Sequence, residues 1–83
     1  MAKNVRITFE NRDKHMTLGL NIAYYRKRNG LTQEQLAEKA GISRTYLGEI
    51  EAPNMVTNIS LEVLTNIAAA LGVSEAKLLE FRE

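Results

Sequence analysis

Residues 31–43 read LTQEQLAEKAGIS, and this stretch decides the fold that the sequence predicts. Thr32, followed three residues later by Gln35, is the pattern of a capping box: the Thr32 side chain accepts the Gln35 amide, and the Gln35 side chain reaches back. A buried apolar stripe at helical spacing consists of Leu36, Ala37 and Ala40. Because Gly41 then breaks the pattern, we expect a short helix that begins after Thr32 and ends at Gly41.

A second helix is expected directly after the turn. Ser43 is a candidate N-cap, and Pro53 forbids any continuation of the helix beyond it. Leu47 and Ile50 supply its inward side. The opposite face, by i, i+4 spacing, carries Arg44, Thr45, Gly48 and Glu49. A helix, a tight turn containing Gly and a second helix are the unit with which DNA-binding proteins place a helix in the major groove.

Three further helices complete the expected fold. One is predicted over residues 18–29 and ends at Gly30, another begins after Ser60 and ends at Gly72, and a short last helix begins after Ser74. The loops between them are brief, as in a compact bundle. The fold class is therefore all-α with five helices.

The first 16 residues are expected to form an extension to a domain that spans residues 17–83. Val5, Ile7 and Phe9 alternate with polar residues, which is a strand pattern. A single short strand has no partner within a helical chain. The extension is therefore either disordered or a strand that pairs with another copy.

Composition limits the function classes. The 83 residues are 45% hydrophobic and 25% charged, as in one small globular domain, and they include no Cys for a disulfide or a thiolate metal site. The charged first segment has no apolar run, so no signal peptide or membrane contact is expected, and the chain is placed in the cytoplasm. His15 is the single His, and no Gly-rich phosphate loop is present. We expect no enzyme, cofactor, metal or small-molecule ligand.

The charge is divided unevenly along the chain. Residues 1–44 hold nine basic and four acidic groups, whereas residues 45–83 hold two basic and six acidic groups. This asymmetry favours a polyanion partner for the first half. Chance clustering of solvated charge is the alternative that composition leaves open.

From Leu18 to Phe81 the chain resembles the Xre/Cro/lambda-repressor-like helix-turn-helix family of bacterial and phage transcriptional regulators. The runs LGLNIAYYRKRNGLTQEQLAEKAGISRTYLGEIE and ISLEVLTNIAAALGVS carry the resemblance. It implies a lambda-repressor-like fold that binds double-stranded DNA sequence-specifically, as a repressor and as a homodimer. The loop at residues 52–59 departs from the family because it is longer and contains no Lys or Arg.

The resemblance also implies site residues. The expected DNA-binding set is Arg26, Thr32, Gln33, Ser43, Arg44, Thr45, Tyr46 and Glu49. Gln33 matches a phosphate contact at a helix N-terminus. Arg44, Thr45 and Glu49 match base-reading positions, and an arginine can bind guanine O6 and N7 in a bidentate way.

An exposed, solvated helix residue without a DNA contact is the alternative for three members of the set: Gln33, Arg44 and Thr45. Four other members also have more than one interpretation. Glu49 either accepts a bond from cytosine N4 or is repelled by phosphate. Ser43 is a helix cap with or without a phosphate bond. Tyr46 is expected mainly to pack, with a hydroxyl that reaches a phosphate as a second role. For Arg26 the resemblance implies an ion pair with Glu51 first and a DNA contact second.

The C-terminal end is the expected dimer interface. Leu78 is expected to close the core, and Leu79 and Phe81 cannot both share its face, so at least one is left for a partner. An alternative function follows from the same apolar residues: a protein-interaction module such as an antitoxin or an anti-regulator.

Overall fold

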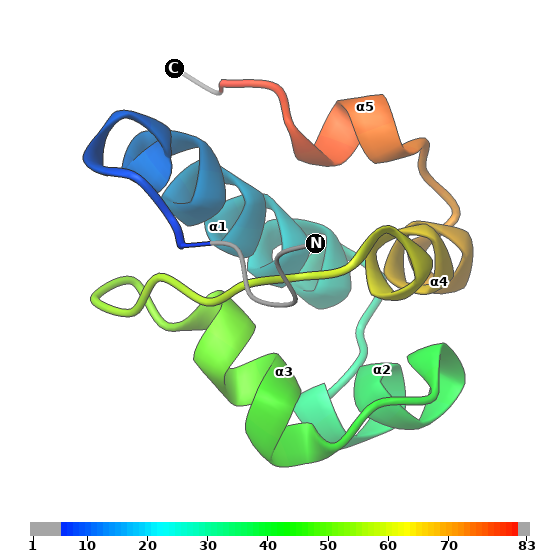
Figure 1. Ribbon diagram of the computed structural model, residues 1–83. Coiled ribbons are helices and arrows are strands. Elements are labelled where there is room, and N and C mark those ends of the chain that lie inside the picture. Colours follow the sequence, from blue (N-terminus) through cyan, green and yellow to red (C-terminus); the bar gives the residue numbers. More distant parts are fainter. Residues whose placement is uncertain (1–5, 82–83) are drawn as a thin grey trace.

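The computed structural model describes residues 6–81, and every regular element in that range is helical (Figure 1). A 3-10 turn, η1 (Phe9–Asn11), leads into α1 (Arg12–Arg28). The remaining helices are α2 (Gln33–Ala40), α3 (Arg44–Glu51), α4 (Leu61–Leu71) and α5 (Glu75–Leu78). The prediction of an all-α fold with five α-helices is confirmed.

The helix boundaries follow the capping residues. The capping box of α2 is complete: Thr32 Oγ1 accepts the Gln35 amide at 3.1 Å, and Gln35 Oε1 accepts the Thr32 amide at 2.9 Å. Ser43, Ser60 and Ser74 each accept a backbone N–H from the third residue of the helix that follows. Local side-chain chemistry therefore sets where α2 to α5 begin.

The first helix begins earlier than its apolar pattern indicated, at Arg12 rather than at Leu18. Residues 12–16 are mostly good helix formers and Asp13 lies in the first turn, where a negative charge is favourable. The strand, one of the two alternatives for the extension, is not formed in the described part of this single chain, since Ile7 has no regular structure and Phe9 opens η1. Val5 lies outside the described residues. The helix α1 therefore crosses the expected boundary between residues 16 and 17.

The core joins all five α-helices. Its buried hydrophobic residues are Leu18, Ile22, Leu36, Ala37, Ala40, Leu47, Ile50, Ile67, Ala68, Leu71 and Leu78. Helix α2 packs mainly against α4 and α3, and α1 packs against α3, α4 and α5. Figure 1 shows that α2 and α3 form one end of the molecule, while α5 and the C-terminal segment lie at the other end.

A close approach of backbones fixes α3 against α1. Gly19, in the middle of α1, is buried, and a Cβ atom at this position would overlap the carbonyl oxygen of Ile50. The helices can cross this closely only because Gly19 has no side chain. The position of α3 is therefore set by backbone contact as well as by Leu47 and Ile50 in the core.

The C-terminal segment is held by a buried amide. Asn21 of α1 is 3% exposed, and its Nδ2 donates to the carbonyls of Leu78 at 2.9 Å and Glu80 at 2.7 Å. Leu78 is fully buried, whereas Leu79 and Phe81 are 41% and 76% exposed. The expected division between core and surface is confirmed for these three residues.

Within residues 6–81, no helix combines the length and the apolar character needed to cross a membrane.

Candidate nucleic-acid interface

One face of α3 is anchored in the core, and the other carries polar side chains. Leu47 and Ile50 are buried, while Arg44 and Thr45 are exposed and Glu49 is half-buried. The helix has the N-cap Ser43 and eight residues. The structure therefore presents Arg44, Thr45 and Glu49 on a rigid element, with their side chains on the side away from the core.

The beginning of α2 meets this face at Gly48. The position that a Cβ atom on Gly48 would occupy lies 3.6 Å from Arg44 Nη1 and 3.9 Å from Gln33 Oε1. Gly48 thus leaves a small open space bordered by an arginine donor and a glutamine acceptor, which we call the Gly48 notch. Packing does not require a glycine here, because an added methyl group would make only ordinary contacts.

A buried ion pair lies behind the notch. Arg26 Nε donates to Glu51 Oε2 at 2.8 Å, and Arg26 Nη2 donates to Glu51 Oε1 at 3.0 Å. Arg26 Nη1 donates to the Leu31 carbonyl at 2.8 Å. The ion pair implied by the resemblance is confirmed, and it ties the last turn of α1 to the end of α3. Since Arg26 is only 9% exposed, its first role is structural.

The same carboxylate also holds Gln33. Gln33 Nε2 donates to Glu51 Oε1 at 3.0 Å, and Gln33 is half-buried. Sequence reasoning missed this bond because the two residues lie 18 positions apart and meet only through the crossing of α2 and α3.

Tyr46 has a different role from the one expected for its hydroxyl. Its Oη–H donates to the carbonyl of Asn58 at 2.7 Å, so its one proton is used within the protein rather than left for a phosphate. Burial raises the pKa of Tyr46 above the ordinary value, and the nearby Glu49 carboxylate raises it further. Thr57 Oγ1 reaches the Glu49 carbonyl at 3.4 Å. Both contacts attach the loop at residues 52–59 to α3.

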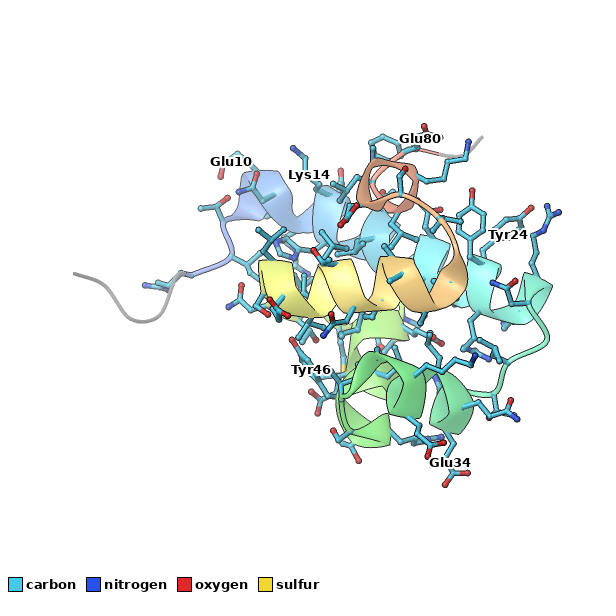
Figure 2. The ribbon with its side chains drawn as sticks, turned by 90° about the vertical axis from the view of Figure 1, so that its right-hand side faces the viewer. Glu10, Lys14, Tyr24, Glu34, Tyr46 and Glu80 are labelled. Carbon is cyan, nitrogen blue, oxygen red and sulfur yellow. The ribbon has the colours of Figure 1, made fainter. Side chains whose placement is uncertain are left out.

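Figure 2 places Tyr46 and Glu34 toward the end of the molecule formed by α2 and α3, and Glu80 at the opposite end. Tyr24 lies elsewhere, on α1, where its hydroxyl accepts a bond from Arg28 at 3.0 Å. That bond and the tyrosine's electrostatic interaction raise the pKa of Arg28. The candidate site is the surface of α3 together with the N-terminal end of α2, and its residues are Thr32, Gln33, Ser43, Arg44, Thr45, Gly48 and Glu49.

This arrangement defines the class of protein. The helix-turn-helix family model matches residues 22–78. The chain belongs to the Xre-type helix-turn-helix family of transcriptional regulators, a family of regulators and not of enzymes.

Individual relatives agree with this assignment. The HTH-type transcriptional regulator SinR of Bacillus subtilis (strain 168) is 43% identical over 63 residues, which are 76% of this chain and 56% of SinR. The control protein C.SmaI of Serratia marcescens is 45% identical over 62 residues, 75% of this chain and 71% of C.SmaI. The chain thus spans little more than half the length of SinR.

A solved structure is similar in fold as well as in sequence. The crystal structure of SinR, the master regulator for biofilm formation, in complex with DNA has a TM-score of 0.70 and 43% identity. The match covers 76% of this chain and 98% of that chain. The expected lambda-repressor-like fold is confirmed.

Proposed function

We propose that this protein is a sequence-specific regulator of transcription, and specifically a repressor, that binds double-stranded DNA in the cytoplasm with α3 in the major groove. The observation that carries the proposal is the surface around the Gly48 notch, where Arg44 on α3 and Gln33 on α2 converge. Membership of a regulator family and the similarity to the DNA-bound SinR structure support it.

The residues divide by the chemistry that they offer. Arg44, near the start of α3, is exposed and can donate two parallel bonds to guanine O6 and N7. Thr45 is its exposed neighbour, and Glu49 supplies an acceptor suited to cytosine N4. These three residues read bases.

Phosphate contacts come from the helix N-termini. Thr32 and Ser43 each accept a backbone N–H, and a hydroxyl that accepts still has its own proton to donate. The first amides of α2 and the second Gln33 Nε2 proton add further donors at the positive end of the helix dipole. The loop at residues 52–59 contributes no cation, so the salt dependence of affinity is shallow.

The experiment is a selection of bound sites from random duplexes, followed by titration of the best site. Arg44→Ala lowers affinity by roughly tenfold or more and relaxes preference at one base pair per half-site. Gln33→Ala weakens binding to all sequences about equally. Arg12→Ala, which removes an exposed arginine at the start of α1, is the matched control for lost charge. Equal affinity for every duplex would overturn the proposal.

We propose further that the protein binds DNA as a homodimer through its C-terminal segment. Leu79 and Phe81 are exposed, and Phe81 borders a hollow of about 390 Å³ that Thr17, Leu20 and Tyr24 also line. The Asn21 bonds hold this segment in place, which lowers the entropy lost on association. Two copies can then occupy half-sites about 34–36 Å apart.

Sedimentation at micromolar concentration tests the dimer, with Phe81→Asp as the disrupting variant. A dimeric wild type and a monomeric variant are expected, because burying an unpaired carboxylate in the interface between two copies costs too much free energy. The same exposed apolar surface favours the second candidate function, a protein-interaction module such as an antitoxin. A monomeric wild type that binds no DNA supports that second function.

A further inference from the structure

The carboxylate of Glu51 takes part in more than an ion pair. Its Oε2 accepts from Arg26 Nε, and its Oε1 accepts from both Arg26 Nη2 and Gln33 Nε2. Glu51 is 7% exposed, and the residue that it bonds on α2 is half-buried at the proposed DNA surface. One buried group therefore connects the last turn of α1, the first residue of α2 and the last residue of α3.

The bond to Glu51 determines which way the Gln33 amide faces. The terminal torsion of a glutamine is broad and roughly two-fold, so a free amide exchanges its oxygen and nitrogen positions readily. A carboxylate accepts bonds but donates none, so only Nε2 of Gln33 can face Glu51. Oε1 then faces the Gly48 notch, which Arg44 Nη1 also borders.

From this geometry we propose that Glu51 is a positioning residue for DNA recognition. It acts through Gln33, holding the amide with its acceptor toward the notch and its second N–H free for a phosphate. Arg26 makes this compatible with DNA, because its guanidinium neutralises a carboxylate that would otherwise repel the phosphates. The proposal rests on the function proposed above for the same surface.

A double-mutant cycle tests whether Glu51 acts through Gln33. Glu51→Asp keeps the negative charge that pairs with Arg26. Its side chain is one methylene shorter, so it cannot bond Arg26 and Gln33 at the same time. Gln33→Met keeps the side-chain length and removes both polar atoms. On a duplex carrying the selected site, we expect Glu51→Asp to lower affinity about 3–10-fold in the wild-type background. In the Gln33→Met background the same change should lower affinity less than about twofold.

A purely structural role for Glu51 gives a different result. If Glu51 only holds α3 in place, Glu51→Asp shifts α3 and lowers the affinity for DNA by the same factor in the wild-type background and in the Gln33→Met background. Such additivity would overturn the proposal. Urea unfolding of each variant identifies the conditions in which all four proteins are folded, and the titrations are made there.

A second measurement needs neither DNA nor a variant. Nuclear magnetic resonance of the wild type follows exchange of the side-chain amide protons of Gln33 and Gln35. Gln35 is the matched control, because it lies on the same helix and its bond in the capping box uses Oε1, not Nε2. We expect slower exchange for the Gln33 proton bound to Glu51 than for either Gln35 proton. Equal exchange at the two residues would overturn the inference.

The two measurements separate this inference from the proposed function. If the wild type binds no specific duplex, the proposed function fails, and the exchange measurement alone still shows whether Glu51 restrains Gln33. If binding is specific and the cycle is additive, the proposed function stands and the role of Glu51 fails.

Discussion

Replacement by alanine is expected to have opposite effects on stability at two glycines that lie inside helices. Gly48 lies in α3, where an added Cβ would contact only Arg44 Nη1 at 3.6 Å and Gln33 Oε1 at 3.9 Å. Gly19 lies in α1, where an added Cβ would overlap the Ile50 carbonyl oxygen. Alanine should therefore stabilise the protein at position 48 and destabilise it at position 19.

The magnitudes follow from the local environment. Gly48→Ala removes the helix-interior penalty of glycine, about 1 kcal/mol, at almost no steric cost. For a domain of this size that gain raises Tm by about 4–8 °C. Gly19→Ala gains the same propensity, but the overlap is with backbone that can move only if α1 and α3 separate. We expect a net loss of about 1–3 kcal/mol.

Urea unfolding followed by circular dichroism measures both variants, and DNA titration is made on the same samples. Gly48→Ala should fold more stably and yet bind the selected duplex roughly tenfold more weakly, because the methyl group fills the notch between Gln33 and Arg44. A destabilised Gly48→Ala, or a Gly19→Ala as stable as the wild type, would refute the reasoning on packing. A stable Gly48→Ala with unchanged affinity would remove the notch from the DNA interface.

Three further perturbations test the polar contacts. Asn21→Ala should cost about 1–3 kcal/mol by leaving two backbone carbonyls without their donor, and hydrogen exchange at the C-terminal segment should become faster; unchanged protection there would contradict the role of this amide. Arg26→Met leaves the Glu51 carboxylate buried without its cation and should cost about 3–5 kcal/mol in urea unfolding, so a loss below about 1 kcal/mol would show that water reaches the carboxylate. The pKa of Tyr46 is higher in the folded protein than its ordinary value of about 10. The contribution of Tyr46 to the free energy of unfolding is therefore complete below about pH 10 and is lost as the pH rises through the folded-state pKa. Tyr46→Phe should therefore be less stable than the wild type at neutral pH, with a difference that shrinks in alkaline urea titrations; a difference independent of pH would assign the effect to packing.

The parts of the fold that sequence predicted correctly depend on short-range chemistry. The capping box of α2 joins Thr32 and Gln35, three residues apart, and the serine caps act over the same distance. The helix α2 ends at Ala40, and its C-cap is Gly41, whose φ of +73° lies in the left-handed region that favours glycine. Such signals are complete within a few residues, so they can be read without knowing how the helices pack.

The contacts that sequence reasoning missed depend on helix crossing. Gln33 and Glu51 meet over 18 positions, and the bonds from Asn21 to the C-terminal segment span 57 and 59. The start of α1 was placed too late because apolar spacing marks only the part of a helix that faces the core. Tyr46 was expected mainly to pack, and the bond from its hydroxyl to the Asn58 carbonyl was missed because the sequence does not show which backbone carbonyl lies near the tyrosine.

In the DNA complex that we propose, the shortness of α3 limits how much sequence one copy of this protein can read. Eight residues at about 1.5 Å per residue give a helix of about 12 Å, which spans roughly three to four base pairs of DNA. A site of four base pairs recurs by chance about once in 256 positions, and two such sites at fixed spacing recur about once in 65,000, against the roughly 10⁶–10⁹ competing sites of a genome. Independently of affinity, then, a single recognition helix of this length carries too little information to mark one operator, and pairing two copies at fixed spacing squares the selectivity.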